Sequence, residues 1–203
     1  TKTDGTAWSW GFNYLGTLGQ NNNTSCSSPI QIPGTTWSTD YRDWRGGETY
    51  AVLTSKTDGT LWGWGRNNSG SLGLNQTSPT STGYSSPVQL PGTTWANTAG
   101  GTTGFAAATK TDGTLWAWGS NSQGQLGQNQ PTNSDRSSPV QLPGTTWNTI
   151  SGGQQSFLAT KTDGTLWSWG YDVYGESGIN AMGPTATRSS PIQIPGTDWI
   201  AAD

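Results

Sequence analysis

The side chains of this chain that could take part in chemistry recur at fixed positions. Four segments carry Lys-Thr-Asp-Gly-Thr, with the acid at Asp4, Asp58, Asp112 and Asp163 and a lysine two residues before each. An aspartate followed by glycine favours a tight turn, in which the carboxylate caps its own backbone. Identical placement in every segment therefore assigns these acids to hairpin turns, and the lysines to hairpin surfaces, rather than to catalysis.

The composition removes the usual partners for catalysis and metal binding. The chain has no histidine and one cysteine, Cys26, which we interpret as a loop thiol, with an intermolecular bridge as the alternative. A serine nucleophile then lacks its ordinary general base, and zinc sites of histidine and cysteine are excluded. The glycine pairs at 46–47, 100–101 and 152–153 recur too, which indicates a structural turn rather than a phosphate loop. We expect no enzyme, no cofactor, no metal site and folding that is independent of metal.

Charge and composition narrow the class of protein further. The 203 residues contain 9 Lys and Arg against 12 Asp and Glu, with no basic cluster, which argues against nucleic acid as a partner. No apolar run is long enough to span a bilayer, so we expect no membrane insertion. Only 30% of the residues are hydrophobic, but 13 are tryptophan, 30 glycine and 11 proline. This combination predicts short strands joined by tight turns around a core built from tryptophan.

The chain is a tandem repeat. Its turn aspartates are 54, 54 and 51 residues apart, and each is followed by a Trp-x-Trp-Gly unit. A Gly-x-Leu-Gly turn, altered in the last copy, then leads to Ser-Ser-Pro and Pro-Gly-Thr-x-Trp. We therefore predict a single domain over residues 1–203, made of four copies of about 52 residues at approximately 1–54, 55–108, 109–159 and 160–203. The chain starts and ends inside a repeat, as expected for a processed chain or a fragment.

Each copy predicts an antiparallel hairpin with two different faces. In the third copy, residues 107–111 and 114–118 flank Asp112-Gly113, a strong hairpin signal. Trp116 and Trp118 share one face of the second strand, and the small Ala117 lies between them on the other. A bulky face and a face that admits close approach favour sheets that stack like blades. We predict an all-β fold, a β-propeller or propeller arc with antiparallel four-stranded blades.

The repeat resembles a known family. Asp-Gly-x-Leu-Trp-x-Trp-Gly-x-Asn-x-x-Gly-x-Leu-Gly is similar to the regulator of chromosome condensation repeat, in the style of bacterial or phage members, and the resemblance covers essentially the whole chain. It implies a β-propeller, which in this family usually has seven four-stranded blades. Four copies leave two alternatives open. Either the C-terminal strand completes the first blade of a small closed ring, or the chain is an arc of a larger ring, which we favour.

Two functions of the family are argued against by the residues. Its nuclear exchange factor has a basic tail, and family repeats commonly carry a histidine after the paired glycines. This chain has no basic tail and has Glu48, Thr102 and Gln154 at those places. Its plant UV-B photoreceptor uses Gly-Trp-Arg-His-Thr motifs, whereas the nearest match here is a single Asp43-Trp44-Arg45-Gly46.

Positions that differ between copies are the better functional candidates, because shared positions mostly report the fold. Trp44 is the tryptophan outside the repeat, in an insertion that also contains Tyr41, Arg42 and Arg45. Such residues dominate interface hot spots, so the insertion is a candidate interface. A partner-facing Trp44 predicts that Trp44→Ala changes the melting temperature by less than about 2 °C. The alternative is a loop that folds Trp44 back over the blade edge.

A second candidate interface lies in the terminal copies. The variable places of Trp-Gly-x-Asn-x-x-Gly are polar in copies two and three. Copies one and four fill them with larger side chains: Phe12, Tyr14 and Leu15, and Tyr171, Val173 and Tyr174. Such a concentration indicates a contact surface, and copies one and four would be neighbours in a closed four-blade ring.

Three functions remain open. The first is a non-enzymatic scaffold for protein binding or self-assembly, as a structural or adhesive part of a secreted assembly or virion surface, which fits the weakly charged polar surface. The second is a lectin, in which exposed aromatic rings stack on glycans. The third is an intracellular adaptor or guanine-nucleotide exchange factor of the same repeat family.

Overall fold

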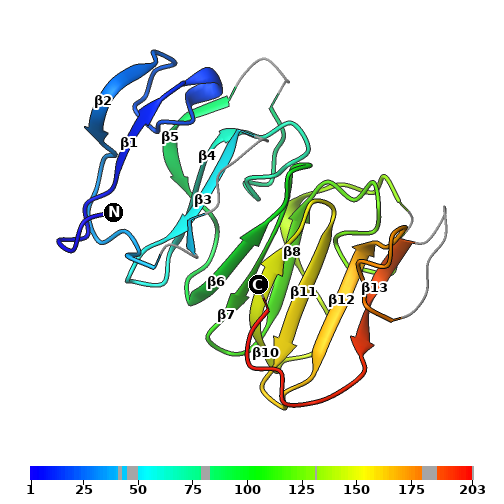
Figure 1. The fold of residues 1–203 in the computed structure, drawn as a ribbon. Helices are drawn as coiled ribbons and strands as arrows, with labels where there is room; N and C mark the ends of the chain where they lie inside the picture. Colours follow the sequence, from blue (N-terminus) through cyan, green and yellow to red (C-terminus); the bar gives the residue numbers. More distant parts are fainter. Residues whose placement is uncertain (41–42, 45–49, 79–82, 131, 180–186, 203) are drawn as a thin grey trace.

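The computed structural model describes residues 1–40, 43–44, 50–78, 83–130, 132–179 and 187–202. These residues form four antiparallel sheets side by side in an arc, with one short 3-10 segment, η1 (Tyr14–Gly16) (Figure 1). The expected all-β propeller architecture is confirmed. The strands, sheet by sheet, are β1 (Trp8–Gly11) and β2 (Cys26–Gln31); β3 (Ala51–Ser55), β4 (Leu61–Arg66) and β5 (Gly83–Gln89); β6 (Trp95–Gly100), β7 (Phe105–Lys110), β8 (Leu115–Gly119) and β9 (Arg136–Gln141); β10 (Trp147–Gly152), β11 (Ser156–Lys161), β12 (Leu166–Tyr171) and β13 (Thr187–Ile194).

The turn aspartates build the hairpins as predicted. Between β7 and β8, the Asp112 carboxylate accepts hydrogen bonds from the Thr114 backbone N–H at 3.0 Å and from its hydroxyl at 2.7 Å. The Thr114 hydroxyl oxygen in turn accepts the indole N–H of Trp116 at 2.9 Å. Gly113 has a φ of 79°, which glycine adopts without steric cost. The other three copies repeat this relay from tryptophan to threonine to aspartate.

The small residue within Trp-x-Trp lets the opposite face pack closely. A Cβ added to Gly63 would lie 3.0 Å from the Leu53 Cδ2 atom and 3.3 Å from the Leu72 Cδ2 atom. Ala117 and Ser168 occupy the same place in the next copies and are buried. Each middle sheet therefore has one leucine-covered face and one tryptophan-covered face, as the alternation predicts.

The sheets are out of phase with the sequence copies. The third and fourth sheets begin at Trp95 and Trp147, which close the preceding copy, and only then take in the next Asp-Gly hairpin. In the second sheet the equivalent Trp37 makes a single bridge to Lys56. Each of these sheets is thus shared between two consecutive copies, with the copy boundary inside a strand.

Tryptophan side chains join neighbouring sheets. The second tryptophan of Trp-x-Trp donates its indole N–H to a backbone carbonyl in the turn of the preceding copy. These bonds run from Trp64 to Thr17 at 2.9 Å, from Trp118 to Ser71 at 3.0 Å and from Trp169 to Gln125 at 2.8 Å. All three donor rings are at most 1% exposed. The core is therefore continuous between sheets.

The two ends of the arc depart from this pattern. The repeat predicts core positions for Trp10 and Trp199, yet they are 60% and 42% exposed. Among the sheets that the described residues form, none precedes that of Trp10 and none follows that of Trp199. The first and last sheets lie at opposite ends of the arc, so the described residues form an open arc rather than a closed four-blade ring (Figure 1).

Candidate binding surface

Three exposed aromatic side chains meet where the first two sheets adjoin. The rings of Phe12 and Tyr14 are stacked, with centroids 6.0 Å apart and planes 18° apart. Tyr50, just before β3, packs edge-on against Tyr14 at 5.8 Å. Phe12 is 67% exposed, Tyr14 48% and Tyr50 37%. We name these three residues the aromatic cluster.

A buried asparagine fixes the loop that presents the aromatic cluster. The Asn13 side-chain carbonyl accepts the Leu18 N–H at 2.8 Å, and its amide donates to the carbonyls of Asn22 at 2.9 Å and Thr24 at 3.1 Å. With Asn13 held inward, Phe12 and Tyr14 on either side of it lie at the surface. Leu15 is only 3% exposed, so its side chain packs in the interior beneath the loop rather than at the surface. Leu15 was predicted from sequence as a contact residue, and its burial corrects that assignment.

The same loop occurs in copies two and three with a polar surface. There the side-chain carbonyls of Asn67 and Asn121 accept the N–H groups of Leu72 and Leu126 at 2.9 and 3.0 Å. The backbone support is therefore shared, whereas the aromatic side chains of copy one are not needed to form the turn. This difference makes the aromatic cluster a candidate for binding rather than for folding.

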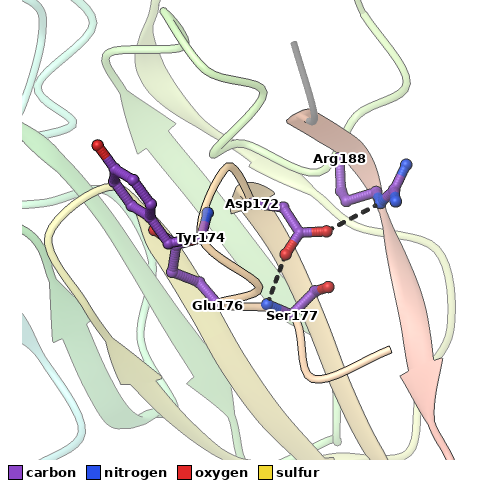
Figure 2. A network of polar contacts seen from close by, with 5 residues as sticks. All are labelled: Asp172, Tyr174, Glu176, Ser177 and Arg188. Atoms are coloured by element: carbon purple, nitrogen blue, oxygen red, sulfur yellow. Dashed lines mark hydrogen bonds and ion pairs between the residues drawn. The ribbon is translucent and has the colours of Figure 1, made fainter. Parts of the chain in front are cut away.

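Copy four replaces the loop asparagine by Asp172, and a cation compensates (Figure 2). The Asp172 carboxylate accepts the Ser177 N–H at 2.8 Å through Oδ1, and its Oδ2 lies 3.3 Å from the Arg188 Nε atom. A carboxylate cannot donate the hydrogen bonds that an asparagine amide donates. Arg188, on β13, instead neutralises a carboxylate whose side chain is 1% exposed. The contact is an ion pair whose geometry departs from a linear hydrogen bond.

The aromatic residues of copy four form a second, separate surface. Tyr174 is 79% exposed, and its ring centroid lies 6.1 Å from that of the half-buried Tyr171. Partial desolvation, followed by the neighbouring Tyr174 and Glu176, raises the pKa of Tyr171. Val173, which lies between the two tyrosines in the sequence, is half-buried. Because copies one and four lie at opposite ends of the open arc, these residues do not join the aromatic cluster (Figure 1).

Trp44 is packed on the second sheet. Its indole N–H donates to the Ser38 carbonyl at 2.9 Å, and its ring centroid lies 6.1 Å from that of Trp37 and 6.2 Å from that of Trp64. The preceding Asp43 accepts hydrogen bonds from the hydroxyls of Ser38 and Ser55. Trp44 itself therefore packs back against the second sheet, as the alternative interpretation expects. Tyr41, Arg42 and Arg45 lie outside the described residues.

Tyr50 is a member of this surface that the sequence did not predict. Tyr50 stands outside the repeated motifs, and its contact with Tyr14 depends on how adjacent sheets are placed.

Across the described ranges, no three His, Cys, Asp or Glu side chains gather as metal ligands would. In the part of the chain that the structure describes, no helix is long and apolar enough to cross a membrane.

An arc of antiparallel sheets joined by repeat tryptophans defines a propeller-type repeat protein. The model of the regulator of chromosome condensation (RCC1) repeat matches residues 4–40, 58–103 and 112–159. The chain therefore belongs to the RCC1 repeat family, as the motif predicted.

Relatives of known sequence or structure agree with this assignment. The chain is 28% identical over 201 residues to the ultraviolet-B receptor UVR8 of Arabidopsis thaliana, covering 94% of this chain and 42% of that protein. It superposes on Prp20p of Saccharomyces cerevisiae with a TM-score of 0.77 at 18% identity, over 95% of this chain and 47% of the other. Human WBSCR16 gives a TM-score of 0.72 at 23% identity, over 95% and 49%. The chain spans less than half the length of each of these relatives.

Proposed function

We propose that this chain is a non-enzymatic scaffold that binds another protein through the aromatic cluster of Phe12, Tyr14 and Tyr50. The observation that carries the proposal is the exposure of Phe12 and Tyr14 on a loop that copies two and three build with polar residues, together with Tyr50 packed edge-on against Tyr14. Rigid aromatic side chains contribute large contact area at low entropic cost, and they are enriched in protein interfaces.

The fold relatives support a protein as the partner. The structural study of Prp20p concerns its binding to Gsp1p and histones, and another structure holds yeast RCC1 (Prp20) bound to Kap60. Those partners belong to those proteins. For this chain, the low content of charged residues, 9 Lys and Arg against 12 Asp and Glu in 203 residues, favours a neutral protein surface over an acidic or basic one. The same composition is the support for the finer part of the proposal, a structural or adhesive role in a secreted assembly or on a virion surface.

The test removes the rings and keeps the loop. Phe12→Ser with Tyr14→Ser gives copy one the residues of copy three, where Ser120 and Ser122 occupy the equivalent places. A photo-crosslinking side chain at position 12 identifies the partner, which is then purified for a direct binding measurement. We expect the double variant to melt within about 2 °C of the parent and to bind the partner at least about tenfold more weakly.

Tyr174→Ser, at an exposed aromatic site in copy four, is the control and should leave binding unchanged. Equal affinity of the parent and the double variant for the purified partner would contradict the proposal. A glycan array probed with the parent and with the double variant tests the lectin alternative. Only a lectin predicts sugar binding by the parent that is lost when the two rings are removed.

A further inference from the structure

The outermost strands of the two middle sheets each carry a proline at the same place. Among the described residues, β5 in the second sheet and β9 in the third pair with a strand on one side only. An open strand edge of this kind is a template on which another strand can pair. Pro87 and Pro139 lie inside these two strands, where each Ser-Ser-Pro segment ends. Both sheets lie within the arc, with a neighbouring sheet on each side (Figure 1).

The proline removes a hydrogen-bond donor from the open side of the strand. The Leu90 N–H donates inward to the Leu61 carbonyl of β4 at 2.8 Å. Backbone groups of successive residues face opposite sides of an antiparallel strand. Position 87, three residues before Leu90, therefore faces outward, and proline there has no N–H to offer another strand. In the third sheet Leu142 makes the equivalent inward bond at 2.8 Å and places Pro139 in the same way.

A loop of the preceding copy occupies the next outward-facing group. The Ser85 carbonyl accepts the Asn21 N–H at 2.7 Å, and the Ser137 carbonyl accepts the Asn75 N–H at 2.8 Å. The two asparagines have left-handed backbones, with φ of 57° and 58°, a conformation that asparagine tolerates better than most residues. The Ser138 hydroxyl also donates to the Asn75 side-chain carbonyl at 2.8 Å. Both serine carbonyls are therefore already bonded within the chain.

The third outward-facing group distinguishes the two strands. In the third sheet the Gln141 carbonyl accepts the side-chain amide of Gln128 at 3.1 Å, and copy one repeats this bond at 3.0 Å. Copy two has Leu74 at the place of Gln128. Among the residues that the structure describes, no side chain donates to the Gln89 carbonyl of β5. The edge of β5 is thus covered less completely than the edge of β9.

We propose that these residues close the outer edges of the blades to strand addition, so that other proteins meet this chain through its loops and side chains. The pairing they prevent is with a second copy of the chain. Two identical strand edges can pair antiparallel around a two-fold axis, which uses the same surface on both copies. Pro87 and Pro139 prevent this pairing because each removes the central outward donor of its strand.

The test replaces these prolines in the 203-residue chain and measures self-association. Pro87→Thr and Pro139→Thr restore the N–H with a β-branched polar residue that suits a strand. Sedimentation across micromolar concentrations should show that each variant self-associates at least about tenfold more strongly than the parent. Hydrogen exchange in the outer strand should become slower in the associated species, because its amides are then paired.

Pro91→Thr and Pro143→Thr are the matched controls. Both prolines are exposed and lie just outside the outer strands, in the Pro-Gly turns. They lose the same ring and gain the same residue, yet they restore no donor on a strand edge, so both variants should associate as the parent does. Edge variants that associate no more than the parent overturn the proposal. Equal association of the edge and turn variants also overturns it, since the loss of any proline would then be the cause.

The difference between β5 and β9 sharpens the test. Pro87→Thr should associate more strongly than Pro139→Thr, because Gln128 still covers the Gln141 carbonyl in the latter. Adding Gln128→Leu, the residue of copy two, should raise the association of the Pro139→Thr variant to that of Pro87→Thr. The aromatic cluster takes no part in these edges, so the outcome is independent of the proposed function.

Discussion

The third sheet and the first sheet contain the same Trp-x-Trp motif and use it differently. In the third sheet Trp118 is 0% exposed and donates to Ser71 of the sheet before it, whereas in the first sheet Trp10 is 60% exposed. The two residues share their sequence context and their place on the strand. The difference teaches that the motif specifies which side chain will join two sheets, while the neighbouring sheet decides whether that side chain is buried.

The largest expected effect is on the free energy of unfolding, and it tests the comparison between Trp118 and Trp10 directly. Trp118→Ala should lower the free energy of unfolding by about 3–5 kcal/mol, because it opens a cavity between two sheets. Trp10→Ala should cost less than about 0.5 kcal/mol, because its ring is already exposed. Urea unfolding of both variants measures the two values. Similar costs would show that burial does not separate the two sheets.

The loop of copy four offers a second way to break the comparison between copies. Arg188→Ala leaves the buried Asp172 carboxylate without its cation, and we expect a loss of about 2 kcal/mol because such a charge is left uncompensated. Adding Asp172→Asn restores the side chain of the other three copies and should recover most of that loss. Unfolding midpoints of the single and double variants give the coupling. Additive losses would mean that the two residues act separately.

Truncating Trp44 should cost an amount of stability between the costs expected for Trp118 and Trp10. Its ring is half-buried against Trp37 and Trp64, so Trp44→Ala should cost about 1–2 kcal/mol, or about 2–8 °C in melting temperature. This is more than the sequence interpretation of a partner-facing ring predicts. Thermal melts decide between them, and Trp44→Phe, which keeps an aromatic ring but loses the bond to Ser38, serves as the control. A change below about 2 °C for the alanine variant would restore the original interpretation.

The smallest expected effect concerns the turn that all four copies share. Hydrogen bonds from Thr60, first from its hydroxyl and then from its backbone N–H, lower the pKa of Asp58 below its ordinary 3.8, and the other turn aspartates behave alike. A lowered folded-state pKa contributes stability above the ordinary pKa, and this contribution is lost as the pH falls through the folded value. Melting temperature should therefore decrease below about pH 4. Asp58→Asn keeps a capping side chain that does not titrate, so its melting curve should depend less on acid.

Local features of the fold were predictable from sequence, and long-range ones were not. The Asp112-Gly113 hairpin and the alternation around Ala117 follow from turn chemistry and strand geometry within a few residues. Tyr50 and Arg188 acquire their roles through contacts with Tyr14 and Asp172, which lie in distant segments of the chain that no spacing rule brings together. Leu15 was misassigned because a left-handed backbone, with a φ of 61°, turns an apparently exposed position into the core. Trp10 and Trp199 matched the core motif, but the sheets that would cover them are not present in the arc.

The offset between sheets and sequence copies has a consequence for how such a chain can change in length. The boundaries after residues 54, 108 and 159 fall within β3, β7 and β11, so the unit that is repeated in the sequence is not the unit that folds. The gain or loss of one whole repeat period nevertheless leaves every strand paired with a strand of the same kind. This holds wherever in the period the insertion or deletion begins, because the order of strands is the same in every period. Slippage by a whole period during replication is therefore structurally tolerated, whereas a change of half a period would leave a strand unpaired.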